Sequence, residues 1–394
     1  MPIILFPLVI LIELAVIAVW LWQHVEMRRI RRERLVVETG PRADPLPSLT
    51  VIIPARNESR RITEGLRSVL AQDLPDLRVV VADDRSDDDT AALVRRIAGE
   101  DDRFSVHRID SLPPGWLGKS HALWSAAQEA RSEWLLFLDA DCRLLPGGLS
   151  AALEYAVRRR ADMLSLWPRD GGLGFWERLL IPLCGAMIVI WYGTRKINDP
   201  ACPEAFANGA FILVRRAAYL RAGGHGSVKA AIIEDIPFAR HMKAAGHSVL
   251  NALGPDVYSV RMYESLSEVV RGWQRIYLGV LTKRQIVLCM LSILVGSLLP
   301  FVLLPVSVAG MLRQADGPWT VLAGLSLAHL AALFATSVRF FSLARCRLRY
   351  LWLYPLSCFG VLYILGAALF QSFGRSTVQW RDTTYQVESS TIRN

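Results

Sequence analysis

The sequence predicts an α/β fold with a doubly wound sheet, joined to membrane helices near both ends of the chain. In the middle of the chain, short apolar runs alternate with helical patterns, as parallel strands covered by helices do. The chain of 394 residues is 52% hydrophobic, and its longest apolar stretches lie near its ends. The predicted parts are an N-terminal anchor (1–24), a cytoplasmic globular domain (42–284) containing an interfacial helix (173–193), C-terminal membrane segments (285–371) and a tail (372–394).

The N-terminal stretch predicts an uncleaved membrane anchor. Met1–Trp22 is apolar apart from Glu13, and Arg28, Arg29, Arg31, Arg32 and Arg34 come after it. A cleavable signal peptide carries its positive charge before the apolar region and a small-residue cleavage site after it, and neither feature is present. By the positive-inside rule, the arginines place the globular domain in the cytoplasm, here on the inner side of a bacterial-type inner membrane.

Three C-terminal stretches are each long enough to cross ~30 Å of hydrocarbon. They are Gln285–Met311, Trp319–Val338 and Leu351–Phe370. Pro300 and Pro305 interrupt the first, so a re-entrant hairpin is an alternative to a single crossing, and the side on which the tail lies stays open. Because arginines beside these segments explain much of the net charge of +9, a nucleic-acid partner is not expected.

Polar residues come directly after three of the predicted strands. Strands are predicted at Leu49–Pro54, Arg78–Asp84, Phe104–Ile109 and Trp134–Asp141, and helices at Arg60–Ala71, Thr90–Gly99 and Lys119–Arg131. The first, second and fourth strands end in PARNE, ADDRSDDD and DAD. Ligands of such sheets bind beyond the carboxyl ends of the strands, so we expect these residues to share one crevice.

Asp139 and Asp141 predict a site for a divalent cation. Two carboxylates so close together repel each other and raise each other's pKa unless a cation lies between them. Mg²⁺ and Mn²⁺ prefer oxygen ligands and keep positions for phosphate oxygens. The alternative, capping of the next helix, is favoured for Asp87–Asp89 but fits this pair less well, because Cys142–Leu145 continues apolar. Taken alone, this D-x-D pattern is weak.

Two further segments carry charged residues at predicted helix starts. In GWLGKSHAL, Lys119 and nearby glycines open a helix, where backbone N–H groups favour an anion, although a solvated lysine is the alternative. Glu234 and Asp235 open a later helix, where acids also favour the helix dipole. The six cysteines lack the spacing of a zinc site or a disulfide framework.

The ordered set PARNE, ADDRSDD, GWLGKSHAL, LDAD, ANGAFILVRR, GGHGSVKAAIIED and VRMYESLSEVVRGWQR resembles the membrane-bound family 2 glycosyltransferases. Within them it is similar to ceramide glucosyltransferases and to the glycosyltransferases of carotenoid and hopanoid pathways. The resemblance covers most of residues 49–279. It implies a GT-A fold, a nucleotide-diphosphate sugar donor such as a UDP-sugar, a lipid acceptor with a hydroxyl or carboxyl group, and a metal-dependent single displacement that inverts the anomeric centre.

The resemblance also implies roles for particular residues. Asp139 and Asp141 match the motif that binds Mg²⁺ or Mn²⁺ and the donor diphosphate, Asp235 matches the general base, and Glu234 is its neighbour. Substrate-binding candidates are Pro54, Arg56, Glu58, Asp83, Asp84, Lys119, His225, Trp273, Gln274 and Arg275. Of these, Glu58, Asp83 and Asp84 correspond to residues that hold the uridine and ribose. A packing tryptophan and a structural turn histidine are the alternatives for Trp273 and His225.

Three rival functions have weaker support. A processive polysaccharide synthase carries a QxxRW segment, whereas this chain has RGWQR at 271–275. A dinucleotide oxidoreductase needs GxGxxG after its first strand, and a non-enzymatic transporter with a nucleotide-binding domain needs polar residues in its spans, where Glu13 and His329 are nearly alone. Residues 173–193 lie between the two acidic motifs, so we expect an interfacial helix instead of a crossing, with a core helix as the alternative. The tail GRSTVQWRDTTY resembles the W-R-x-Y tail of the same family.

Overall fold

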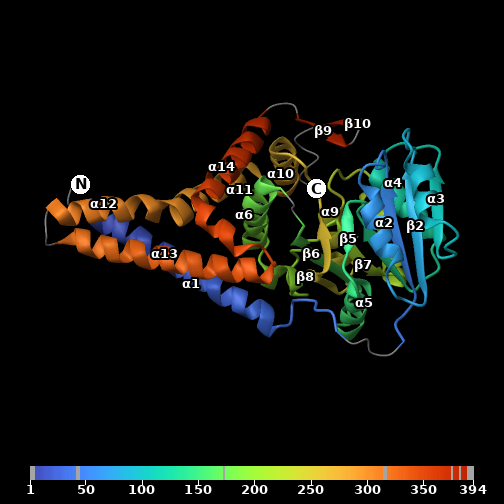
Figure 1. The fold of residues 1–394 in the computed structure, drawn as a ribbon, viewed down its shortest axis with the longest axis horizontal. Helices are drawn as coiled ribbons and strands as arrows, with labels where there is room; N and C mark the ends of the chain where they lie inside the picture. Colours follow the sequence, from blue (N-terminus) through green and yellow to red (C-terminus); the bar gives the residue numbers. More distant parts are fainter. Residues whose placement is uncertain are drawn as a thin grey trace.

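The structure is a computed structural model that describes residues 5–40, 45–171, 174–313, 317–373, 376–380 and 383–387. It consists of a globular α/β part and a long helical part that projects from it (Figure 1). The globular part contains the sheet and the residues predicted to form a site. The projecting part contains most of the two segments with the highest mean hydropathy, Lys283–Arg313 and Phe6–Arg32.

In the described residues the main sheet has eight strands in the order β3-β2-β1-β4-β7-β6-β8-β5. Its first half is parallel: β1 (Leu49–Ala55) lies between β2 (Leu77–Asp84) and β4 (Trp134–Leu138), and β2 pairs with β3 (Phe104–Ile109). These strands confirm the predicted ones to within a few residues. The prediction was wrong in extending the fourth strand to Asp141, because the chain turns after Leu138 and both aspartates lie in or beside that turn.

The second half of the sheet is mixed. β7 (Phe211–Arg215) runs antiparallel to β4 and to β6 (Met163–Asp170). β8 (Val249–Val260) is parallel to β6 and antiparallel to β5 (Cys142–Leu144). The antiparallel β7 brings the residues just before it, 208–210, to the same edge of the sheet as the end of β4.

Helices cover both faces of the sheet. Val51 and Ile53 of β1 belong to one buried cluster, whereas Ile52 between them belongs to another. This alternation confirms the doubly wound arrangement, because successive strand residues point to opposite faces. The covering elements are α2 (Ile62–Leu70), α3 (Thr90–Ala98), α4 (Gly118–Glu129), α5 (Gly148–Arg158), α7 (Thr194–Asn198), α8 (Arg216–Arg221), η1 (Gly224–Val228) and α9 (Asp235–Ala244). At the start of α3, Asp88 accepts a hydrogen bond from the Thr90 N–H (3.0 Å), as the capping alternative predicted.

Three helical segments form the projecting part. α1 (Leu5–Arg32) packs on α13 (Pro318–Leu343), which packs on α12 (Leu299–Arg313). α11 (Lys283–Ile293), the π-helical turn η2 (Leu294–Leu298) and α12 succeed one another without a break. The segment is therefore one continuous rod, and the hairpin considered from its prolines is not adopted.

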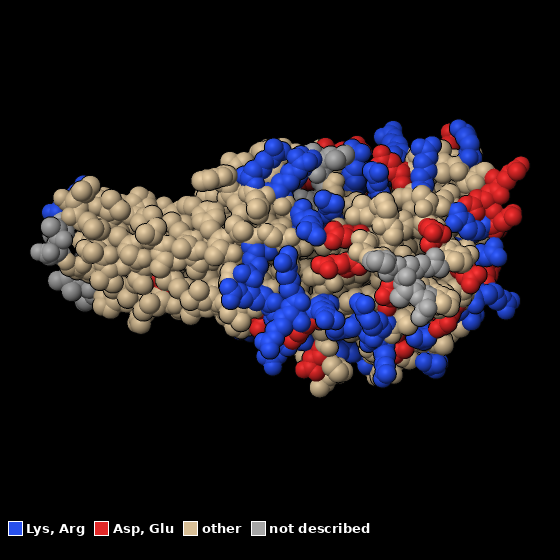
Figure 2. Space-filling view, turned by 60° about the horizontal axis from the view of Figure 1, so that its bottom comes forward, with Lys and Arg blue, Asp and Glu red and all other residues tan. Residues whose placement is uncertain are grey.

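Charge divides the two parts of the molecule. The projecting part shows almost no charged side chains, and Lys and Arg gather where it joins the globular part (Figure 2). The last turn of α1 contributes Arg29, Arg31 and Arg32 to this junction. Among the described residues, five helices are long and apolar enough to cross a membrane.

A further layer of helices lies between the projecting part and the sheet (Figure 1). It contains α6 (Phe175–Tyr192), α10 (Leu266–Val280), η3 (Leu348–Leu353) and α14 (Tyr354–Gln371). The two ends of η3–α14 contact the other helices of this layer. Tyr350 of η3 lies 5.9 Å from Phe175 of α6 between ring centroids, and Gln371 Oε1 of α14 accepts a hydrogen bond from Gln274 Nε2 of α10 (2.7 Å). α14 therefore packs along both α6 and α10, and its end lies at α10.

Beyond α14, β9 (Ser376–Trp380) and β10 (Thr383–Val387) form an antiparallel hairpin. The predicted W-R-x-Y tail falls here, and parts of it, at 374–375 and 381–382, lie outside the described residues.

Candidate active site

The carboxyl ends of β1, β2 and β4 lie at one edge of the sheet. Ala55 is level with Asp83 on β2, and Ile52 is level with Phe137 on β4, two residues before Asp139. The parallel register therefore brings the first, second and fourth predicted strand ends together. The polar residues that come after these strands share this edge.

Lys119 joins two of the predicted acidic motifs. Its Nζ lies 2.8 Å from Asp139 Oδ1 and 2.9 Å from Glu234 Oε1. Burial lowers the pKa of Lys119, but Asp139 and Glu234 outweigh it and hold that pKa well above its usual value. Burial alone would raise the pKa of Glu234. The nearby Lys119 ammonium outweighs burial, so the pKa of Glu234 is lowered. The three side chains therefore form a charged cluster, with α4 supplying the cation.

Asp141 has an oxygen that the described residues do not satisfy. Its Oδ1 is buried without a hydrogen-bond partner among them, and burial, with the charge of Asp139 as the next cause, raises its pKa to about 7. A buried carboxylate oxygen without a partner is costly, and a divalent cation would satisfy it. Among the described residues no group of three or more His, Cys, Asp or Glu side chains is arranged to hold a metal ion. Asp139 and Asp141 could supply carboxylate oxygens to such a cation, and a diphosphate and water could supply further oxygens.

Two backbone N–H groups hold the Asp235 carboxylate, whose pKa lies near neutrality. Its Oδ2 accepts a hydrogen bond from the Gly209 N–H (2.8 Å), and its Oδ1 accepts one from the Ile236 N–H (2.8 Å). Burial, with the charge of Glu234 as the next cause, raises its pKa to about 7. A carboxylate of this basicity suits proton abstraction at physiological pH.

The loop before β7 connects the two acidic motifs. The Asp139 N–H donates to the Ala210 carbonyl (3.2 Å), while the neighbouring Gly209 N–H binds Asp235. A Cβ at Gly209 would lie 3.0 Å from Asp235 Oδ2, so glycine permits this close approach. Asn208 and Gly209 were not predicted from the sequence to belong to the site. An Asn-Gly pair just before a strand was the available signal.

The ends of β1 and β2 form a second polar group beside this cluster. Asp84 is buried, and its carboxylate lies 2.8 Å from Arg85 Nε and 3.8 Å from Arg56 Nη1. Asp83 is also buried and accepts a hydrogen bond from the Ser86 N–H (3.3 Å). Arg85, which was not predicted as a site residue, is the closest cation to Asp84.

Comparison with known proteins gives a family for this sheet and site. The family model described as Glycosyl transferase family 2 matches residues 50–221. Residues 50–221 form a family 2 glycosyltransferase domain. This confirms the family resemblance, and the matched residues include β1, β2, β4 and the aspartates at their ends.

The glycosyltransferase domain also has curated relatives. A 4,4'-diaponeurosporenoate glycosyltransferase of Staphylococcus aureus (strain MRSA252) is 29% identical over 231 residues, which are 58% of this chain and 60% of that protein. The chain therefore matches about three fifths of that relative's length. Among solved structures, a Pyrobaculum calidifontis mannosyltransferase in complex with GDP-Man and Mn²⁺ has a TM-score of 0.48 at 20% identity, over 92% of this chain and 98% of that one.

Four residues predicted to bind substrate are not part of the Lys119, Asp139 and Glu234 cluster. They are His225, Trp273, Gln274 and Arg275. His225 is fully buried, stacks on Phe238 (4.9 Å between ring centroids), and has its pKa lowered to about 4 by burial. It lies beneath the surface and does not line an exposed acceptor wall, because the glycine-rich η1 turn folds it inward. The Tyr219 hydroxyl accepts a hydrogen bond from the His225 backbone N–H (3.1 Å).

The α10 candidates also serve packing in this structure. Trp273 is buried against Tyr277 (5.6 Å between ring centroids), which is the packing alternative. Gln274 Nε2 donates to the Ala367 carbonyl (3.2 Å) of α14, so it joins two helices. Arg275 is exposed on α10. The contact of Gln274 could not be predicted without knowing that α14 packs against α10.

Replacing Lys119 by methionine should destabilise the domain. Glu234 would stay buried without its cation, and breaking a mostly buried pair costs about 3 kcal/mol. We expect the free energy of unfolding, measured by denaturant titration at pH 7.5, to fall by about that amount. Lys229→Met, at an exposed position, is the matched control. An unfolding free energy equal to the control's would contradict a stabilising role for the cluster.

Proposed function

We propose that the chain is a membrane glycosyltransferase that moves a sugar from a nucleotide-diphosphate donor, such as a UDP-sugar, to a hydroxyl or carboxyl group of a lipid. The observation that supports this most is the pair of contacts at 209–210. The Gly209 N–H binds the Asp235 carboxylate, and the Ala210 carbonyl binds the N–H of Asp139. A base and a predicted metal motif are thereby held in one rigid unit.

The proposed chemistry is a single displacement with inversion. Asp235 takes the proton of the acceptor hydroxyl, the acceptor oxygen bonds to the anomeric carbon, and the bond from that carbon to the diphosphate oxygen breaks. A bound Mg²⁺ or Mn²⁺ on Asp139 and Asp141 would neutralise charge on the leaving diphosphate. Asp83, Asp84, Glu58, Arg56 and Pro54 are proposed to hold the nucleoside.

Lys119 has a further role in this proposal. Its ammonium lies between Asp139 and Glu234, at the start of α4, where N–H groups also favour an anion. We infer that it contacts the donor diphosphate when Asp139 engages a cation. Burial raises the pKa of Asp235 and the charge of Glu234 raises it further, so Glu234 helps to maintain the basicity of Asp235.

The membrane arrangement extends the proposal to the acceptor. α1, α11–α12 and α13 are proposed to cross the bilayer, with the catalytic domain and the tail on the cytoplasmic side. α6 and α14 would lie at the membrane surface: Trp352, Phe359, Tyr363 and Phe370 of η3–α14 are more than half exposed, as interfacial helices are. The carotenoid substrate in the name of the Staphylococcus aureus relative supports a lipid acceptor.

The direct test uses membranes that contain the full chain. Labelled UDP-glucose, UDP-galactose and UDP-glucuronate are supplied with Mn²⁺ or with EDTA, and lipids are extracted and identified. We expect one donor to label one lipid class only with the metal. No label in any lipid, with every donor, would contradict the function.

A further inference from the structure

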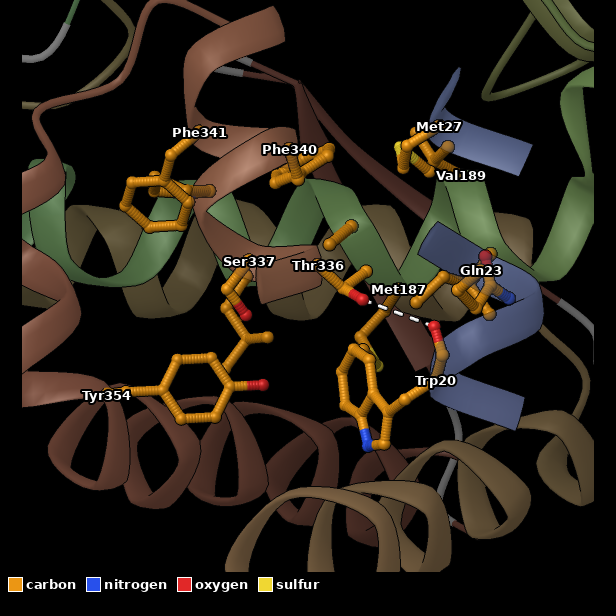
Figure 3. Close-up of a pocket in the computed structure, with 14 residues that line it drawn as sticks. Trp20, Gln23, Met27, Met187, Val189, Thr336, Ser337, Phe340, Phe341 and Tyr354 are labelled. Atoms are coloured by element: carbon orange, nitrogen blue, oxygen red, sulfur yellow. Dashed lines mark hydrogen bonds between the residues drawn. The ribbon is translucent and has the colours of Figure 1, made fainter. Parts of the chain in front are cut away.

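A cavity separates the projecting helices from the interfacial layer. Figure 3 shows side chains converging on it from α1, α6, α13 and the start of α14, among them Trp20, Met187, Phe340 and Tyr354. All four helices belong to segments long and apolar enough to span a membrane. The cavity is thus bounded by helices from segments long and apolar enough to lie in a membrane.

The lining presents mainly hydrocarbon. Thr336 Oγ1 donates to the Ala332 and Trp20 carbonyls (2.9 and 3.2 Å), the second of which is drawn in Figure 3. The Tyr354 hydroxyl lies 3.1 Å from Ser297 Oγ. The Thr336 and Tyr354 hydroxyls are thus engaged by the protein, and apolar cavities do not hold water well.

The wall is fixed before any ligand arrives. Trp20 Nε1 donates to the Gly296 carbonyl (2.7 Å), and His329 Nε2 lies 2.9 Å from the same oxygen. Gly296 lies within the π-helical turn η2, a type of turn that frees carbonyl groups and is frequent at functional sites. His329 Nδ1 lies 3.0 Å from Glu13 Oε2. This buried network locks the indole that forms one side of the cavity.

α6 leads from the cavity toward Asp235. Met187 lines the cavity, and Tyr192 lies five residues further along α6, about 7–8 Å at the helical rise. The Tyr192 ring lies 5.0 Å from that of Phe206, which stacks on Trp167 at 4.8 Å. Ile236, next to Asp235, belongs to the same buried cluster as Tyr192 and Phe206.

We propose that this cavity binds the hydrocarbon chain of the acceptor lipid, so that the enzyme selects an acceptor whose reactive group ends a long apolar chain. The inference rests on the proposed function. It assigns chain recognition to α1, α6, α13 and α14, with Met187 of the lining about 7–8 Å along α6 from Tyr192. Ile190, which is 39% exposed at the edge of the lining, marks the side where the chain enters.

Two neighbouring small residues of α6 give a matched pair of variants. Ala186 lines the cavity. Gly185 is outside the lining, and a Cβ there meets no atom within 4 Å. Ala186→Trp places a large side chain in the cavity, Ala186→Leu places a smaller one there, and Gly185→Trp places a large side chain outside it.

The first measurement is independent of catalysis. The full chain in phosphatidylcholine nanodiscs is irradiated with a hexadecanol that carries a diazirine near its methyl end, and labelled peptides are mapped. We expect labelling around Met187 and Phe340 that falls at least fivefold in Ala186→Trp, falls less in Ala186→Leu, and persists in Gly185→Trp. Absent labelling in the wild type, or equal labelling in Ala186→Trp, would overturn the inference.

The second measurement is transfer of labelled sugar into membrane lipid. Ala186→Trp should lower product formation at least tenfold, Gly185→Trp should stay within twofold of the wild type, and both should keep Mn²⁺-dependent donor binding. Normal transfer by Ala186→Trp would contradict the assignment of this cavity to the acceptor chain but not the proposed function. A wild type that binds no donor would instead refute the proposed function, so the two failures are distinguishable.

Discussion

Asp235→Asn should lower sugar transfer by about 10²- to 10⁴-fold, the usual contribution of a general base, and leave donor binding intact. The asparagine carbonyl oxygen can still accept the Gly209 N–H that now binds Oδ2. Its NH2 group replaces the oxygen that accepts the Ile236 N–H, so one of the two backbone hydrogen bonds is kept and the basicity is removed. The measurement is the initial rate of labelled lipid formation at saturating donor. Asp89→Asn, at an exposed position at the start of α3, is the control and should keep the wild-type rate.

The same carboxylate sets the pH dependence. Asp235 must be deprotonated to accept a proton, and its pKa is raised to about 7, so the wild-type rate should fall about tenfold per pH unit below 7 and level off above it. A raised folded-state pKa contributes stability at low pH that is lost as pH rises through 7. The unfolding free energy of the wild type should therefore fall, relative to Asp235→Asn, between pH 5 and 8. A pH-independent rate across this range would argue against Asp235 as the base.

Asp141→Asn is expected to remove metal-dependent turnover, by about 10²- to 10³-fold or more, as loss of a main electrostatic group at a reacting centre does. The substitution keeps the shape and removes the charge whose Oδ1 has no partner among the described residues. Turnover is measured as labelled lipid formed with increasing Mn²⁺.

The control for Asp141→Asn is the variant's own fold. Burial raises the pKa of Asp141 to about 7, so removing its charge should not lower the unfolding free energy at pH 8. Nucleoside binding in EDTA should also be retained. Full Mn²⁺-dependent activity in this variant would remove Asp141 from the site.

Much of the domain could be predicted because its signals are local. A buried parallel strand is a short apolar run, and the polar residues after β1, β2 and β4 are visible in the same pattern. Parallel register then places Asp83 and Asp139 at one edge without further information. Asp88, which was expected to cap α3, needed only its position relative to Thr90.

The remaining features depend on contacts between distant segments. Nothing near His225 in the sequence reveals that Phe137 and Phe238 enclose it, and Gln274 meets Gln371 across 97 residues. The role of Gly209 appears only when Asp235 lies beside it. The prolines of α12 predicted a break that the π-helical turn avoids, because that turn absorbs an extra residue without ending the helix.

The most direct test of the proposed mechanism is whether a metal on Asp139 and Asp141 contacts the donor diphosphate. Purified full-length chain is loaded with Mn²⁺ and a UDP-sugar, and the electron–nuclear hyperfine coupling between Mn²⁺ and ³¹P is measured. The mechanism predicts a phosphorus coupling in the wild type that requires both protein and donor and is lost in Asp141→Asn. The same coupling in Asp141→Asn, or none in the wild type at saturating donor, would contradict it.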